Sequence, residues 1–243
     1  MFLFVSADQL DMPKLVLHHF LMDRMFNRFP NQTIRSSAMS AQTVIDYYLS
    51  PVSPWTYLAA SRFRELAARH NATVHLYLVD LSKVFPVSGG LPLPQRAPQR
   101  QAYRLQEMAR ISRYLNQPLI SQPAHFPPSS GLAGLVMAAA RARLDITDTL
   151  QASEVMMARL WAHDEDIGIA DVLESALTEA GFDGVGLVAD AQENAETYMA
   201  EIAADTERAI EANVFGAPTF IVDGEMFWGQ DRLELLDWHL SSL

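Results

Sequence analysis

The sequence contains no cysteine among its 243 residues. The chain therefore forms no disulfide bond, offers no thiolate to a metal and has no thiol of its own for redox exchange. If the protein performs sulfur chemistry, the thiol must come from a bound molecule.

Positive charge is also scarce: 18 Lys and Arg residues stand against 29 Asp and Glu residues, and the net charge is −11 at pH 7. Nucleic acids and anionic membrane surfaces both require a basic patch on the protein that binds them. No continuous apolar run is long enough for a signal sequence or a membrane span. We therefore expect neither a nucleic-acid partner nor a membrane partner.

Several functional patterns are missing too. The 7 histidines show no ligand spacing with acidic residues that would suggest zinc. The stretch Gly184-Val185-Gly186 lacks the strand–helix context and the third glycine of a dinucleotide-binding motif. No nucleophile elbow and no Ser-His-Asp order appears, which argues against an acyl-transfer serine. We therefore expect no metal site.

The stretch from Ile45 to Ala59 carries the strongest local signal. An apolar run rich in aromatic residues ends in Ser and Pro, and a helix-forming sequence follows, which predicts a buried strand, a tight turn and a helix beginning near Pro54. Ser53 then lies at the helix N-terminus, where free N–H groups and the helix dipole favour an anion. On this local pattern alone, Ser53 is better explained as a simple helix N-cap, since Ser is among the preferred N-cap residues.

A second stretch, from Val214 to Arg232, favours a functional role for Ser53 beyond that of a simple N-cap. Gly216-Ala217-Pro218 opens an apolar strand, Asp223-Gly224 predicts a hairpin turn, and a second strand ends at Gly229. A strand–turn–helix unit followed late in the chain by a proline-led hairpin is the plan of thioredoxin. In that plan, Ser53 and Thr56 occupy the two cysteine positions of a C-x-x-C motif, and Pro218 occupies the cis-proline position that faces them.

An apolar content of 49% and a length of 243 residues suit a globular protein with one domain, or one domain with an insertion. We expect an α/β fold with a βαβ…ββα core made from residues 43–96 and 206–243, and an inserted helical domain at 97–205. Residues 1–42 are predicted to be an N-terminal extension, with a short amphipathic helix around Lys14–Phe26.

The elements expected within this plan follow from periodicity and turn residues. The strands are predicted at Thr43–Leu49, Val74–Val79, 219–222 and 225–228, and the helices at Pro54–His70, Ala97–Leu115, Gly131–Arg143, Ile146–His163, Ile169–Ala180, Ala189–Ala212 and Asp231–Leu240. The first two strands are joined through a helix and should be parallel. Phe85–Pro94, dense in Pro and Gly, is predicted to be a loop, either functional or a surface connector.

From about Thr43 to its C-terminus, the sequence resembles the 2-hydroxychromene-2-carboxylate isomerases and the kappa-class glutathione transferases, a DsbA-like branch of the thioredoxin superfamily. The resemblance is carried by Ser53-Pro54-Trp55-Thr56-Tyr57-Leu58, Phe215-Gly216-Ala217-Pro218-Thr219, Phe227-Trp228-Gly229-Gln230-Asp231-Arg232 and the segment from Val79 to Gly90. It implies a cytoplasmic, homodimeric, glutathione-dependent isomerase that acts on an intermediate of aromatic catabolism. A kappa-like glutathione transferase and a non-catalytic thioredoxin-like binding module are the alternatives.

The resemblance also implies roles for individual residues. Ser53 would stabilise the glutathione thiolate, since a hydroxyl donor at a helix N-terminus lowers a thiol pKa. The backbone of Ala217, next to a cis Pro218, would pair with the tripeptide as an added strand. The γ-glutamyl end would bind Gln230 and Asp231. The apolar surface offered to an aromatic substrate would come from Trp55, Phe85 and Trp228.

The chain departs from the family at one place. It has Gly90 where family members often carry Asn, and it lacks their basic residue near Phe85-Pro86. This leaves open which residue holds the glycine carboxylate of glutathione; Lys83 and Arg96 are candidates, and neither is preferred. The remaining basic residues of this region, Arg100, Arg104, Arg110 and Arg113, are interpreted as a solvated helix face paired with the acidic remainder.

Overall fold

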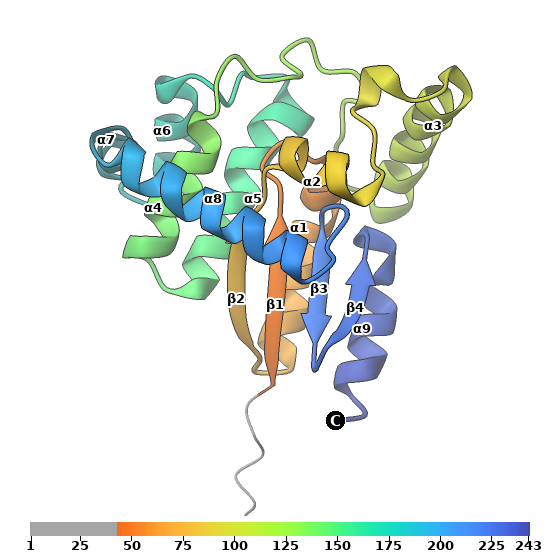
Figure 1. The fold of residues 1–243 in the computed structure, drawn as a ribbon. Helices are drawn as coiled ribbons and strands as arrows, with labels where there is room; N and C mark the ends of the chain where they lie inside the picture. Colours follow the sequence, from red (N-terminus) through yellow and green to blue (C-terminus); the bar gives the residue numbers. More distant parts are fainter. Residues whose placement is uncertain (1–42) are drawn as a thin grey trace, which may run out of the picture. The chain divides into compact units, whose positions relative to one another are not determined.

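Four strands form one mixed sheet in the order β2-β1-β3-β4 (Figure 1). Strand β1 (Val44–Leu49) pairs in parallel with β2 (Thr73–Leu78) and antiparallel with β3 (Thr219–Val222). Strand β3 in turn pairs antiparallel with β4 (Glu225–Trp228). The expected parallel first pair and the expected late hairpin are confirmed.

The computed structural model describes residues 43–243. The expectations for residues 1–42, including the helix around Lys14–Phe26, lie outside the described residues. Among the described residues, no helix combines the length and apolar character needed to cross a bilayer.

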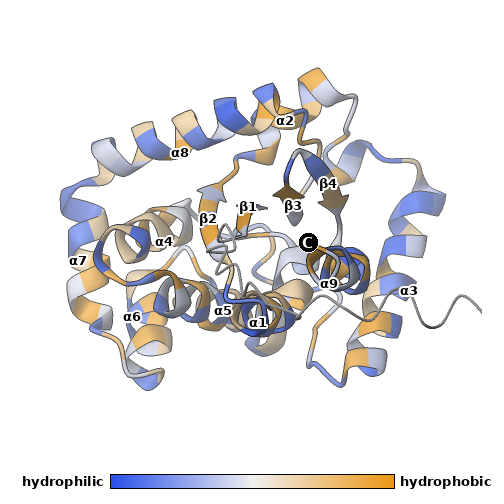
Figure 2. Cartoon of the chain, turned by 90° about the horizontal axis from the view of Figure 1, so that it is seen from below, coloured by the Kyte–Doolittle hydropathy of each residue, from blue (hydrophilic) through white to orange (hydrophobic). Residues whose placement is uncertain are grey.

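Helices cover both faces of the sheet (Figure 2). Helix α1 (Pro54–Arg69) and helix α9 (Leu233–Leu240) lie on one face, and helix α8 (Ala195–Glu211) lies on the other. On the α1 side, the ring of Tyr47 lies 4.4 Å from that of Phe63 and 4.9 Å from that of Phe220, measured between centroids. These three fully buried aromatic rings join α1 to the two central strands.

The remaining helices lie between β2 and β3 in the chain. They are α2 (Leu81–Ser88), α3 (Pro98–Leu115), α4 (Leu132–Arg143), α5 (Ile146–His163), α6 (Ala170–Glu179) and α7 (Gly184–Glu193), with a short 3-10 turn at Leu93–Gln95. A second 3-10 turn, Gln230–Arg232, follows β4. The predicted boundary at residue 205 falls inside α8, and residues 42–243 form one compact unit. The division into a thioredoxin-like domain and an inserted domain therefore stays a prediction.

Two local predictions were wrong. The first half of the expected loop Phe85–Pro94 belongs to α2, which begins because the Asp80 side chain accepts the Ser82 N–H at 2.9 Å. It ends at Gly89, whose φ of 77° suits a residue without a Cβ. The single helix expected over Ala189–Ala212 is two helices, α7 and α8, which meet at Asn194.

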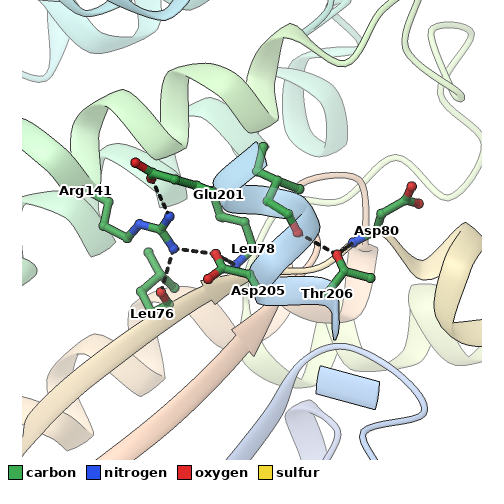
Figure 3. A network of polar contacts seen from close by, with 8 residues as sticks. Leu76, Leu78, Asp80, Arg141, Glu201, Asp205 and Thr206 are labelled. Carbon is green, nitrogen blue, oxygen red and sulfur yellow. Dashed lines mark hydrogen bonds and ion pairs between the residues drawn. The ribbon is translucent and has the colours of Figure 1, made fainter. Parts of the chain in front are cut away.

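Strand β2 is an edge strand of the sheet, and side chains from α4 and α8 cover its free edge (Figure 3). Asp205 accepts the Leu78 N–H at 3.0 Å, and Thr206 accepts the Asp80 N–H at 3.0 Å. Arg141 donates to the Leu76 carbonyl at 3.0 Å and to Asp205 at 2.5 Å. These contacts satisfy main-chain groups that would otherwise be left open at the sheet edge, and they fix α8 where β2 leads into α2.

We expect the Asp205→Ala variant to lower the free energy of unfolding by about 1–3 kcal/mol, because it leaves the Leu78 N–H without an acceptor and removes one of the two carboxylates bound to Arg141. Urea unfolding at neutral pH measures the loss. The exposed Glu207, also on α8, supplies the matched control Glu207→Ala, which should change stability by less than about 0.5 kcal/mol. Equal losses in the two variants would contradict this role of Asp205.

Candidate functional site

A cavity of about 740 Å³ opens at the carboxyl ends of β1 and β2. Its walls come from the turn after β1, from α2, from the start of α3, from the loop before α4 and from the segment before β3. Its lining includes Ser53, Trp55, Phe85, Gly90, Arg96, Arg100, Arg104, Phe126, Gly216, Ala217 and Trp228. The turn that carries Ser53 and the segment that carries Ala217, far apart in the sequence, therefore line the same cavity.

Ser53 lies at the N-terminus of α1 and is buried. Its Oγ accepts the Thr56 N–H at 3.3 Å and donates to the Ala217 carbonyl at 3.1 Å. The peptide bond between Ala217 and Pro218 is cis, as the resemblance implies. Thr56 is fully buried, and its hydroxyl has no hydrogen-bond partner among the described residues. The side chain in contact with the proline segment is thus that of Ser53.

The aromatic residues predicted to contact a substrate, Trp55, Phe85 and Trp228, all line this cavity. Trp228 is 51% exposed, and its ring lies edge-on to that of Phe215 at a centroid distance of 4.7 Å. A Cβ on Gly90 would lie 2.4 Å from the ring of Phe85. Phe85 therefore occupies space that the Asn side chain often found there in family members would need.

The structure places Gln230 and Asp231 differently from the other candidates. They follow Gly229, whose N–H donates to the Pro218 carbonyl at 2.9 Å, but neither residue lines the cavity. The Gln230 side-chain oxygen accepts from Arg62 at 2.5 Å, and the Asp231 carboxylate pairs with Arg232 at 2.7 Å. Their assignment to the γ-glutamyl end of glutathione stays a prediction.

The pairing with acidic residues that we expected for Arg100 and Arg104 of α3 was wrong. Arg96, Arg100 and Arg104 line the cavity, and none of them forms an ion pair within residues 43–243. Only Arg110 matches the expected pairing, through Glu107 one turn away. The spacing of Arg96, Arg100 and Arg104 by four residues places them on one helix-like face, and this spacing was the signal available in the sequence.

The cavity wall before α4 is held by one buried carboxylate, Asp166. Asp166 accepts the N–H groups of Ser129 at 3.1 Å and Gly168 at 2.8 Å. Burial acts to raise the pKa of Asp166, but these hydrogen bonds and the nearby His125 outweigh it and lower the pKa below its ordinary value. The charged form of Asp166 thus stabilises the loop that carries the cavity residues Phe126, Pro128 and Ser130.

Within the described part of the chain, no three His, Asp or Glu side chains come together in a way that could hold a metal ion. The cavity offers serine hydroxyls, three guanidinium groups, the carboxylate of Asp80, main-chain groups and aromatic rings to a ligand.

A serine at the N-terminus of the first core helix, facing a cis-proline segment on a mixed four-stranded sheet, defines a thioredoxin-like protein of the DsbA type. Residues 44–241 match the family model described as a DSBA-like thioredoxin domain, and the chain belongs to this family.

Two named enzymes are similar to most of this chain. The chain is 29% identical over 205 residues to a 2-hydroxychromene-2-carboxylate isomerase of Pseudomonas putida, covering 82% of this chain and 95% of that protein. It is 23% identical over 203 residues to glutathione S-transferase kappa 1 of Caenorhabditis elegans, covering 79% and 88%. A solved structure of a 2-hydroxychromene-2-carboxylate isomerase superposes with a TM-score of 0.65 at 22% identity, covering 82% and 95%. The relatives are enzymes.

We expect the Asp166→Asn variant to be less stable than the wild type at pH 7 by about 1–3 kcal/mol, because the buried N–H groups lose a charged acceptor. Since the pKa of Asp166 is lowered in the folded state, its stabilisation is present above the ordinary carboxyl pKa. It is lost as the pH falls through the folded-state pKa, so the difference between the two proteins should shrink in acid.

Urea unfolding of both proteins between pH 7 and pH 3 measures this difference. Asp171→Asn, at an exposed residue near the start of α6 with no side-chain hydrogen bond in the described range, controls for the change in net charge. A stability difference for Asp166→Asn that stays constant down to pH 3 would contradict the role given to its charged form.

Proposed function

We propose that this protein is a glutathione-dependent isomerase of the 2-hydroxychromene-2-carboxylate isomerase type, acting on a small aromatic substrate. The observation that carries the proposal is the buried Ser53 hydroxyl, placed at a helix N-terminus and against Ala217, in a chain without cysteine. The relatives named isomerase support the reaction, and the kappa-class relative supports glutathione.

The residues of the cavity suit a thiol-bearing peptide. In the described residues, the Ala217 N–H has no hydrogen-bond partner, while the Ala217 carbonyl accepts from Ser53. Both groups belong to the short segment directly before β3, so a peptide backbone could pair with them there as an added strand. Arg96 and Arg100, without ion pairs of their own, suit the peptide's glycine carboxylate.

Glutathione would supply a thiolate that adds to a conjugated double bond, permits rotation about that bond and leaves again unchanged. The part of Ser53 is to keep the sulfur charged. A free thiol has a pKa of about 8.5 and is mostly protonated at neutral pH. A hydroxyl donor and the N-terminal N–H groups of α1 favour the charged form and lower that pKa.

For glutathione to bind in this way, the Ser53 hydroxyl would have to donate to the sulfur in place of the Ala217 carbonyl. Its O–H donates to the Ala217 carbonyl at 3.1 Å, and a hydroxyl has a single proton to donate. When a peptide N–H takes over the Ala217 carbonyl, the Ser53 O–H is free to rotate toward the sulfur. Docking of the peptide backbone and stabilisation of its thiolate are therefore coupled through one hydroxyl.

We expect millimolar glutathione to raise the melting temperature of the protein, because a ligand of the native state stabilises it by about 2.7 kcal/mol at a concentration one hundred times its Kd. Differential scanning fluorimetry measures the shift, with S-methylglutathione as a probe of the tripeptide without a free thiol. The absence of any shift would favour a non-catalytic binding module with Ser53 as a simple N-cap.

In the Ser53→Ala variant we expect the pKa of the bound glutathione thiol to rise by about one unit or more, equivalent to about 1.4 kcal/mol per unit. Thiolate absorbance against pH measures it in the complex. Ser53→Thr, which keeps the hydroxyl, should restore most of the lowering, whereas Ser88→Ala, at another serine of the cavity wall, should change nothing. An unchanged titration in Ser53→Ala would remove Ser53 from the mechanism.

The isomerase and the transferase differ in the fate of glutathione. With 2-hydroxychromene-2-carboxylate as substrate, an isomerase converts it while the glutathione concentration stays constant. A kappa-like transferase would consume one glutathione for each product. Thiol titration alongside the absorbance change of the substrate separates the two, and we expect no consumption.

A further inference from the structure

Arg104 is half-buried in the cavity wall and has no polar partner. Arg96, by comparison, donates from its Nε to the Leu91 carbonyl at 2.8 Å. Within residues 43–243, the Arg104 guanidinium makes neither a hydrogen bond nor an ion pair. A guanidinium carries five N–H donors, and those of Arg104 are available to an acceptor that enters the cavity.

Two aromatic rings hold this guanidinium in place. The Cζ of Arg104 lies 5.8 Å from the ring centroid of Phe126 and 5.9 Å from that of Trp161. The two rings are themselves in contact, with centroids 5.2 Å apart, and Trp161 is fully buried. Cation–π contacts of this kind fix the position of the charge without using its N–H donors. The fork of donors is thus positioned and left free for a ligand.

The charge of Arg104 is also uncompensated. Burial and the neighbouring Arg96 lower the pKa of Arg104 to about 10, which still leaves the group charged at neutral pH. An anion beside Arg104 would favour its charged form and so oppose the lowering of its pKa by burial and by Arg96. A carboxylate matches the guanidinium best, because its two oxygens accept two parallel N–H bonds.

We propose that Arg104 is a specificity-determining residue that binds a carboxylate of the electrophilic substrate, while the ring of that substrate packs against Phe126. The identity of the reaction rests on the proposed function, but the binding of an aromatic carboxylate does not. Arg104 belongs to α3, a different segment from Ser53 and Ala217. Its aromatic surroundings suit a flat aromatic acid better than the flexible glycine end of a tripeptide.

The test uses trans-2-hydroxycinnamate and its primary amide as probes, titrated calorimetrically into the full-length protein without glutathione. We expect the wild type to bind the carboxylate at least tenfold more tightly than the amide. Arg104→Met keeps an apolar side chain of similar length on the two rings. It should weaken binding of the carboxylate by roughly tenfold to a hundredfold and leave binding of the amide unchanged.

Arg113→Met is the matched control, since Arg113 is exposed on the same helix and does not line the cavity. It should bind both probes as the wild type does. Arg104→Lys keeps the charge but not the planar guanidinium donors, so its affinity for the carboxylate should lie between those of the wild type and Arg104→Met. Equal affinity of wild type and a folded Arg104→Met for the carboxylate would overturn the inference.

Glutathione binding, measured separately by thermal shift, distinguishes this inference from the proposed function. We expect Arg104→Met to keep the shift that glutathione gives the wild type. Loss of that shift with unchanged affinity for the carboxylate would assign Arg104 to glutathione and overturn the inference. Carboxylate binding that depends on Arg104, in a protein that glutathione does not stabilise, would support the inference while removing the proposed function.

Discussion

The hydrogen bond from Ser53 to the Ala217 carbonyl is the point on which the site depends, since it joins segments 164 residues apart in the chain. Sequence alone left Ser53 as either an N-cap or a stabiliser of a thiolate. The geometry makes these two roles compatible. The cap uses a lone pair of Oγ to accept the Thr56 N–H, whereas stabilising an anion uses the hydroxyl proton. The Ala217 carbonyl accepts that proton in the structure, and in the proposed complex a peptide N–H would take its place at this carbonyl.

This hydroxyl is in position because the sheet holds β1 and β3 side by side, and because the edge of β2 is covered. The ring of Tyr47 contacts Phe63 of α1 and Phe220 of β3, so α1 is fixed relative to the strand that follows Pro218. On the other side of the sheet, Asp205 and Thr206 bind the main chain where β2 leads into α2. The aromatic contacts and the polar network therefore hold in place the ends of β1 and β2, where the cavity opens.

The sequence predicted the elements whose signals are local. The turn at Asp223-Gly224 and the alternation around it define the β3–β4 hairpin without tertiary information. Helix α2 was missed because Pro86 and Gly89 read as loop residues, although the Asp80 cap is enough to start a helix. The place of Arg104 in the cavity wall was missed because the rings that it contacts, Phe126 and Trp161, come from other segments. Contacts of that kind arise only when distant parts of the chain pack together.

Charge is distributed in a way that separates the cavity from the rest of the protein. Among residues 43–243, most arginines outside the cavity are bound to carboxylates, as Arg141 is to Asp205 and Arg159 is to Glu179. Arg96, Arg100 and Arg104 instead concentrate uncompensated positive charge at one opening of a protein with a net charge of −11. The lining holds three guanidinium groups and one carboxylate, that of Asp80, so the cavity wall is positive overall while the chain is acidic. In the proposed site, this difference would favour small carboxylates inside the cavity over large polyanions, which must also contact the exterior.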